Sequence, residues 1–300
     1  MRILVIGDLH GQKPRIHFKN FDCIIQVGDV CSDKEFRLYI NKWFNLLKSS
    51  KEVDISVDDL IINSIGKRGL KKLEKDSLKQ GKEILEYLNS FGKPVFIVPG
   101  NWDQSFKETK EEREGNFYYI RNYLTKFSGE RTNSYLTKGL KNVFDCQFNL
   151  NQFGKINFIG YGLSSVPEKP NRKKDKITKR QFSILKKKYD SLLSKLFVQY
   201  IKRDKSLPII FITHNIPHGK LDLVKNKKNY ANNKHLGSNI AEDFCKRAKP
   251  LLCIGGHIHE AKGKAKIGKT VVINAGFGKD AQVLIEVDEK KKKIKKIKFF

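Results

Sequence analysis

Short apolar runs recur along the chain between polar or helical stretches, and they constrain the fold more than any other feature. The runs are Ile3–Ile6, Cys23–Val27, Val95–Val98, Ile156–Gly160, Ile209–Thr213, Leu251–Ile254 and Val271–Asn274. Several are continuous stretches of Val, Ile and Leu, which is typical of strands covered on both faces. Two further runs, Gln282–Val287 and Ile294–Phe299, are predicted to pair as antiparallel strands.

Helical segments separate these predicted strands. Apolar residues recur with a period close to 3.6 in Ser77–Phe91 and in Thr178–Ile201, as in helices that bury one face. Strands that alternate with helices predict a layered α/β domain. We expect one domain over residues 1–300, with insertions near 49–75 and 167–205.

The composition excludes some classes of protein. No run of about 18 apolar residues is present, so no membrane-spanning helix is expected. The first residues read as a strand that meets an acid and not as a signal peptide. The five cysteines are odd in number and lack paired metal spacing, which favours reduced thiols in a cytoplasmic protein.

The formal net charge of +28 has two interpretations. A strongly basic chain is typical of a partner to nucleic acid or another polyanion. Lysine greatly outnumbers arginine, however, and the charge is spread along the whole chain, as codon bias in an AT-rich genome would produce. The second interpretation is favoured, and a nucleic-acid partner stays open.

The residues that follow the predicted strands form a pattern. They are Asp8 and His10, Asp29, Asn101 and Asp103, His214, and His257 and His259. Each alone has an ordinary explanation, since an Asp after a strand is often a helix cap. Open α/β sheets bind ligands at the carboxyl ends of their strands, so the whole set indicates one site.

These residue types favour a metal site. Carboxylates, imidazoles and one amide oxygen suit Mn²⁺, Fe²⁺, Zn²⁺ or Ni²⁺. The candidate ligands are too many for one tetrahedral ion and about right for two ions that share a carboxylate. Such a pair activates water and clamps a phosphoryl group.

The ordered set Asp8-x-His10, Gly28-Asp29, Gly100-Asn101-x-Asp103, His214 and Gly256-His257-x-His259 resembles the calcineurin-like metallophosphoesterase superfamily. The resemblance implies a four-layer α/β/β/α sandwich of two mixed sheets, with a dimetal site at the carboxyl ends of the strands. It implies that Asp8, His10 and His259 hold one ion. It also implies that Asn101, His214 and His257 hold the other, and that Asp29 bridges the two. The implied nucleophile is a hydroxide that bridges two divalent ions. Mn²⁺ is the favoured identity of these ions.

One position departs from the pattern of that superfamily. Trp102 stands where a histidine usually follows the asparagine and helps to stabilise the leaving group. An indole donates one hydrogen bond and is no proton shuttle, so a phosphodiesterase is favoured over a monoesterase. We expect Trp102 to stack on a base or aromatic leaving group. His218, in the loop after His214, is a candidate proton donor.

The expected function is therefore a metal-dependent phosphoesterase that acts on phosphoesters, nucleotide-like ones included. Asp29, Asn101 and His214 are expected to face the phosphate. Two alternatives stay open: a scaffold that uses the same fold for binding without catalysis, and a nuclease that acts on DNA. The scaffold has no need for a complete ligand set, which favours the enzyme.

Overall fold

The computed structural model describes residues 1–49, 55–103, 111–114, 117–120, 135–162, 164–173, 175, 177–227 and 231–300. The first of its two large sheets has the strand order β14-β13-β1-β2-β3-β6. Its strands are β1 (Arg2–Ile6), β2 (Cys23–Gln26), β3 (Val95–Ile97), β6 (Val143–Asp145), β13 (Gln282–Asp288) and β14 (Lys293–Phe299). The sheet is mixed, because β1, β2, β3 and β6 run parallel whereas β13 is antiparallel to both β1 and β14.

The second large sheet has the strand order β11-β12-β10-β9-β8-β7. Its strands are β7 (Leu150–Phe153), β8 (Ile156–Tyr161), β9 (Ile209–Asn215), β10 (Leu252–Gly256), β11 (Gly263–Ile267) and β12 (Thr270–Asn274). The inner four strands are parallel and the two edge strands are antiparallel. A separate pair, β4 (Glu111–Glu114) and β5 (Phe117–Ile120), forms an antiparallel hairpin.

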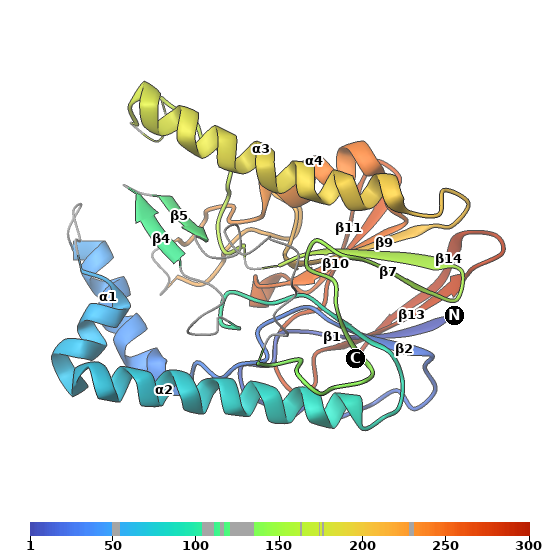
Figure 1. Ribbon diagram of the computed structural model, residues 1–300, viewed down its shortest axis with the longest axis horizontal. Coiled ribbons are helices and arrows are strands. Elements are labelled where there is room, and N and C mark those ends of the chain that lie inside the picture. The colour runs from blue at the N-terminus through green and yellow to red at the C-terminus, as the bar shows by residue number, and fades with distance from the viewer. Residues whose placement is uncertain are drawn as a thin grey trace.

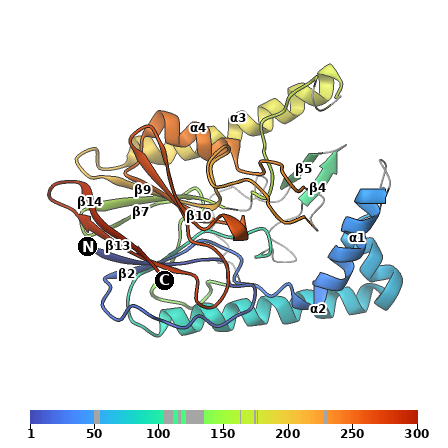
Figure 2. The same ribbon diagram turned by 180° about the vertical axis from the view of Figure 1, so that it is seen from behind.

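Helices cover the outer faces of the two sheets. Helix α2 (Val57–Asn89) lies along the first sheet, and α3 (Lys179–Lys202) and α4 (Asn239–Ala248) lie along the second (Figure 1). Helix α1 (Arg37–Ser49) packs against the beginning of α2, away from both sheets, and the reverse view shows the same layers (Figure 2). The predicted four-layer α/β/β/α sandwich of two mixed sheets is confirmed.

The layering explains why the predicted strand Ile3–Ile6 is apolar at every position. In β1, Ile3 and Val5 join the buried cluster between the two sheets, whereas Leu4 and Ile6 join the cluster beneath α2. Successive side chains of a strand point to opposite faces, so a strand covered on both faces has no polar side to show.

All the strands predicted from apolar runs are present, within a residue or two of the expected bounds. Helix α3 begins after Thr178, whose hydroxyl accepts a hydrogen bond from the Gln181 backbone amide. The Gln181 side-chain oxygen accepts one from the Thr178 backbone amide, which completes a capping box. Helix α2 begins at Val57 and not at Ser77, so that boundary was wrong. The apolar residues before Ser77 pack against α1, and Gly66 (φ 73°) interrupts the helical period.

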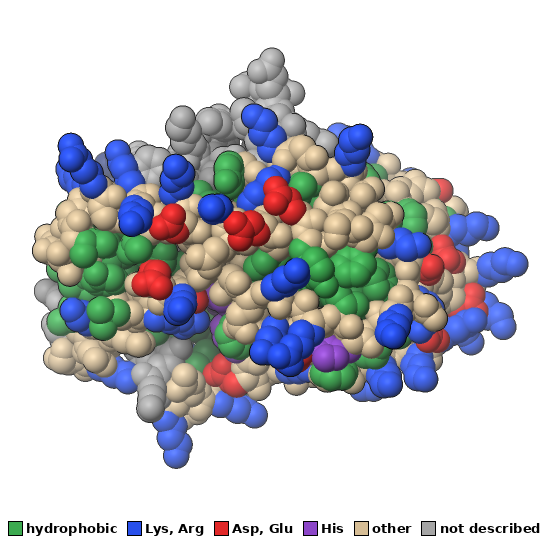
Figure 3. All heavy atoms as spheres, turned by 90° about the horizontal axis from the view of Figure 1, so that it is seen from below, with side chains coloured by type: hydrophobic (Ala, Val, Ile, Leu, Met, Phe, Trp, Pro, Cys, Tyr) green, Lys and Arg blue, Asp and Glu red, His purple; other side chains and the backbone are tan. Residues whose placement is uncertain are grey.

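Other expectations concern the surface and the cysteines. All five cysteines are buried and free of disulfides. No helix within the described ranges is both long and apolar enough to cross a membrane. Lys and Arg side chains lie scattered among acidic and neutral ones on the face shown in Figure 3. The single domain with insertions near 49–75 and 167–205 stays a prediction, and residues 50–54, 174 and 176 of those insertions lie outside the described residues.

Helix α3 offers a direct test of the layers. Leu196 is fully buried against the second sheet, whereas Ile201 is 69% exposed on the same helix. We expect Leu196→Ala to lower the free energy of unfolding by about 2–5 kcal/mol, because it leaves a cavity, and Ile201→Ala to change it little. Urea denaturation measures both, and equal midpoints for the two variants would contradict this packing.

Candidate metal centre

Five neighbouring strands bring the predicted residues to one edge of the sandwich. In the first sheet, β1, β2 and β3 lie side by side and lead into Asp8, Asp29 and Asn101. In the second sheet, β9 contains His214 and its neighbour β10 leads into His257. Because the two sheets stack with these ends together, residues far apart in the sequence meet in a buried site.

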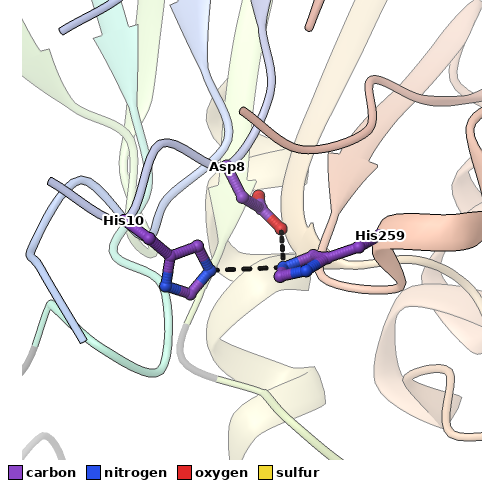
Figure 4. Close-up of side chains that lie close together, drawn as sticks. All are labelled: Asp8, His10 and His259. Carbon is purple, nitrogen blue, oxygen red and sulfur yellow. Dashed lines mark hydrogen bonds and ion pairs between the residues drawn. The ribbon is translucent and has the colours of Figure 1, made fainter. Parts of the chain in front are cut away.

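The first group of side chains consists of Asp8, His10 and His259 (Figure 4). The Nε2 atoms of the two imidazoles lie 3.2 Å apart, and His259 Nε2 lies 3.5 Å from Asp8 Oδ2. One nitrogen or oxygen atom from each residue lies within 4.8 Å of the others, so the three atoms can share one ion.

The second group consists of Asp29, His214 and His257. One donor atom from each of these residues again lies within 4.8 Å of the others. Asn101 lies beside it, since its Oδ1 is 2.9 Å from His214 Nε2. The structure thus gathers every residue that the sequence predicted as a ligand.

Asp29 of the second group also faces the first group. Its Oδ2 is 3.3 Å from His10 Nε2 in the first group and 3.5 Å from His214 Nε2 in the second. Its Oδ1 accepts a hydrogen bond from the Trp102 backbone amide at 2.8 Å. One carboxylate oxygen therefore faces both groups while the other fixes the orientation of the side chain.

The backbone around these residues is held in unusual conformations. His10, Asp29 and His257 have φ values of 44°, 55° and 67°, in the left-handed region that non-glycine residues seldom adopt. Such conformations cost on the order of 1–3 kcal/mol each and persist where the surroundings impose them. A Cβ on Gly100 or Gly256 would overlap the carboxylate of Asp29 or Asp8, so glycine is needed at both positions.

The remaining ring nitrogens of three histidines face oxygen atoms. His10 Nδ1 lies 3.0 Å from Asp33 Oδ2, His214 Nδ1 lies 2.9 Å from the Val27 carbonyl, and His257 Nε2 lies 3.0 Å from the Ser165 carbonyl. The hydrogen bonds of His214 and His257 and the ion pair of His10 orient the three rings and leave the opposite nitrogen of each ring for an ion. That nitrogen is Nε2 in His10 and His214, and Nδ1 in His257.

Burial and neighbouring charges act against each other on the two buried carboxylates. Burial raises the pKa of Asp29 above its usual value. Burial also acts to raise the pKa of Asp8, but the hydrogen bond from His259 and the charge of His214 outweigh it, and the pKa is lowered.

Burial and neighbouring charges also compete to set the pKa values of the imidazoles. Burial acts to lower the pKa of His10, but the carboxylates of Asp29 and Asp33 outweigh it and raise the pKa to about 9. Burial, followed by the charge of His214, lowers the pKa of His257 to about 3. The pKa of His214 is raised because Asp29 and other carboxylates outweigh burial. The site thus combines charged and neutral groups at close range.

Hydrogen bonds satisfy only one of the two carboxylate oxygens of Asp8. Asp8 Oδ1 is buried without a hydrogen bond, although Oδ2 of the same carboxylate accepts one from the His257 amide at 2.6 Å. A buried carboxylate oxygen without a donor is costly unless a cation meets it. This oxygen and the mixed oxygen and nitrogen donors fit divalent ions of the kind the sequence predicts.

The residues after Asn101 shape the site in two ways. The Trp102 ring packs against Phe36, with ring centroids 5.6 Å apart, while its amide holds Asp29. Asp103 forms the turn, because its two oxygens accept hydrogen bonds from the Cys31 amide (2.9 Å) and the Gly100 amide (2.7 Å). Stacking of Trp102 on a substrate stays a prediction.

His218 lies outside both groups. It is half-buried, its amide donates to the Ser238 carbonyl at 3.0 Å, and its ring centroid is 5.9 Å from that of His235. Its role as proton donor stays a prediction. His235 Nδ1 in turn lies 2.6 Å from Asp222 Oδ1.

Sequence reasoning missed Asp33, which contacts His10. The only signal was an acid four residues after Asp29 in the same loop, and such an acid has many ordinary explanations. Its contact depends on how the loop after β2 folds back, which no periodicity reveals.

A sandwich of two mixed sheets that gathers imidazoles and carboxylates where its strands end has the architecture of a metal-dependent hydrolase. Residues 1–261 match the family model described as calcineurin-like phosphoesterase. The chain belongs to the calcineurin-like phosphoesterase family. The family hydrolyses phosphoesters with two metal ions, so the chain is a metal-dependent phosphoesterase.

A solved structure shares this fold. One crystal structure aligns over 100% of this chain and 98% of its own, with a TM-score of 0.56 and 16% identity, and shows a similar fold. Weaker similarity extends to the protein TT1561 of Thermus thermophilus (12% identity, 99% and 98% of the two chains, TM-score 0.44). It also extends to the phosphopantetheinyl hydrolase of Mycobacterium tuberculosis (13% identity, 92% and 89%, TM-score 0.45). No curated protein matches the sequence.

The turn at Asp103 yields a prediction that is independent of metal. Asp103→Ala leaves two amides without their carboxylate, and hydrogen bonds to charged groups contribute about 1.5–3 kcal/mol each. We expect the free energy of unfolding to fall by about 2–5 kcal/mol. The control is Asp204→Ala, which removes an exposed carboxylate bonded to the Ser206 amide at 2.8 Å. Denaturation midpoints that fall equally in both variants would contradict the role of Asp103.

Proposed function

We propose that the chain hydrolyses phosphodiesters with two divalent ions, held by the residues that its strands bring together. Asp8, His10 and His259 would hold one ion, Asn101, His214 and His257 would hold the other, and Asp29 would bridge them. Mn²⁺ is the ion we expect, with Fe²⁺, Zn²⁺ and Ni²⁺ as alternatives that the same donors accept.

The position of Asp29 carries this proposal. A single oxygen that lies 3.3 Å from a nitrogen of one group and 3.5 Å from a nitrogen of the other is suited to contact two ions at once. Asp29 is 1% exposed, so its charge is costly to bury unless cations compensate for it.

When bound, the two ions would activate water and neutralise charge on the phosphoryl oxygens. The chain's own residues orient the site. Asp33, Val27 and Ser165 fix three imidazole rings through their outer nitrogens, and the Trp102 amide fixes Asp29. Such fixed orientation is what makes polar groups effective toward a reacting centre.

Trp102 favours phosphodiesters over phosphomonoesters as substrates. A phosphomonoester carries one more negative charge than a diester, and the usual histidine at this position can be protonated to meet it. The indole is neutral, and its ring packs against Phe36. The diester class, which includes nucleotide-like compounds, therefore suits the site better.

The two alternatives have less support. A binding scaffold has no need for two groups of buried donors with a carboxylate between them. A nuclease is expected to concentrate its basic residues along a track for the backbone, whereas they are scattered on the face in Figure 3.

Asp29→Asn tests the bridge. The amide keeps the shape and one oxygen acceptor but removes the charge shared by two cations, so we expect the bound metal to fall from two ions per chain to one or none. Metal analysis after dialysis measures this, with circular dichroism to verify the fold. Asp22→Asn, at the opposite end of β2, is the control.

A variant at position 29 that retains two ions and normal turnover would show that Asp29 does not bridge. Loss of metal in both the Asp29 and the Asp22 variants would indicate general destabilisation instead.

Trp102→His tests the preference for diesters. A charged hydrogen bond contributes about 1.5–3 kcal/mol, so the variant should raise kcat/KM for nitrophenyl phosphate relative to bis-nitrophenyl phosphate by about 10- to 150-fold. The two substrates share a leaving group, so their ratio reports on the charge of the phosphate. Trp102→Phe keeps a neutral ring as control, and an unchanged ratio in the histidine variant would contradict the proposal.

A further inference from the structure

The segment from Asp33 to Arg37 contacts the first group of the metal centre, reaches Asp29 through Trp102, and also begins α1. It contains a short 3-10 helix, Lys34–Phe36, and continues directly into α1. We use "helical hairpin" for α1 together with residues 57–73 of α2.

Asp33 contacts the first group. Its carboxylate is nearly buried, with 6% of the side chain exposed, and its Oδ2 lies 3.0 Å from His10 Nδ1. The opposite nitrogen, His10 Nε2, faces His259 and Asp29 at 3.2 and 3.3 Å. The contact is an ion pair without hydrogen-bond geometry, and the negative charge of Asp33 favours a proton on Nδ1, which leaves the Nε2 lone pair for an ion.

The same carboxylate is held by the helical hairpin. Arg37, the first residue of α1, places Nη2 2.5 Å from Asp33 Oδ2. The oxygen that faces His10 is therefore also the oxygen that pairs with α1. A shift of α1 would move or release it.

Phe36 makes a second connection, to the other side of the centre. The centroid of its ring lies 5.6 Å from that of the Trp102 ring, and the Trp102 amide donates a hydrogen bond to Asp29 Oδ1 at 2.8 Å. The segment thus reaches one ligand through Asp33 and the central carboxylate through Phe36.

The helical hairpin has its own small apolar cluster. Phe36, Tyr39, Ile40, Ile61 and Leu70 are its buried members, and Trp102 packs at its edge. This cluster is separate from those beneath the two sheets. Gly66, with φ 73° and ψ 169°, interrupts α2 inside the hairpin. A unit with a small core of its own can open locally without unfolding of the sandwich.

We propose that Asp33 is a positioning residue that makes ion binding by Asp8, His10 and His259 and docking of the helical hairpin depend on each other. With the hairpin docked, Arg37 holds Asp33 against His10 and the imidazole is oriented for an ion. By reciprocity, an ion on His10 stabilises the docked hairpin to the same extent. This inference rests on the proposed function, because it takes those three residues as ligands.

Metal binding is the first readout. Calorimetric titration with Mn²⁺ compares the wild type with Asp33→Ala and Asp33→Asn. We expect Asp33→Ala to lower the affinity for one of the two ions by about 10- to 100-fold, as the loss of such supporting contacts does. The affinity for the other ion should be nearly unchanged. Asp33→Asn keeps a neutral acceptor and should fall between Asp33→Ala and the wild type.

The matched control is Asp190→Ala. Asp190 pairs with Lys186 at 2.5 Å with the same four-residue spacing in a helix, on α3. The Asp190→Ala variant should bind both ions like the wild type. The Lys186–Asp190 pair is exposed and has no contact with the metal centre among the described residues.

Hydrogen exchange of α1 is the second readout. If Asp33 had only a structural role, Mn²⁺ would not change the rate of amide exchange in α1. Saturation with Mn²⁺ should slow amide exchange in residues 37–49 of the wild type, and the slowing should be lost in Asp33→Ala. Wild-type affinity for both ions in the two Asp33 variants, or slowing that persists in Asp33→Ala, would overturn the proposal.

The outcomes also separate this inference from the proposed function. A wild type that binds no pair of ions contradicts the proposed function. A wild type that binds two ions, with Asp33 variants that bind them equally well, contradicts only the role of Asp33. Should Asp33→Ala fail to fold, Asp33→Asn decides, with a several-fold weakening of one ion expected and unchanged affinity overturning the proposal.

Discussion

The carboxylate of Asp29, buried between two groups of imidazoles and carboxylates, is the constraint on which the rest of the structure depends. Burying a charge costs several kcal/mol unless opposite charges and hydrogen bonds compensate for it. The Trp102 amide meets one oxygen, and His10 and His214 face the other. The same cost explains why the site is built for cations, since imidazoles alone compensate only when they are protonated.

The sandwich supplies the rigidity that this arrangement needs. Three residues of the site have positive φ angles, and such conformations persist only where packing on all sides imposes them. The cluster between the sheets provides that packing directly beneath the site. Phe96 of β3 stacks on Phe158 of β8, with ring centroids 4.1 Å apart, and joins the two sheets. Stability of the core and geometry of the centre are therefore parts of one problem.

Much of this arrangement was predictable from the sequence, for a physical reason. A strand covered on both faces must be apolar throughout, so β1 and β9 stand out as runs, and the polar residues that follow mark their carboxyl ends. Helix α1 was not predicted, because only Tyr39 and Ile40 are buried along it and its apolar residues pack against α2 and not against a sheet. The contacts of Asp33 with His10 and of Trp102 with Phe36 were equally hidden. They depend on how loops fold back in three dimensions, and no local pattern encodes that.

The central claim is that one carboxylate oxygen serves two ions. Anomalous X-ray diffraction from crystals of the Mn²⁺-loaded protein tests it most directly. A bridging Asp29 should give two anomalous peaks roughly 3.5–4 Å apart, both in contact with its carboxylate. A single peak, or two peaks of which Asp29 contacts only one, would contradict it.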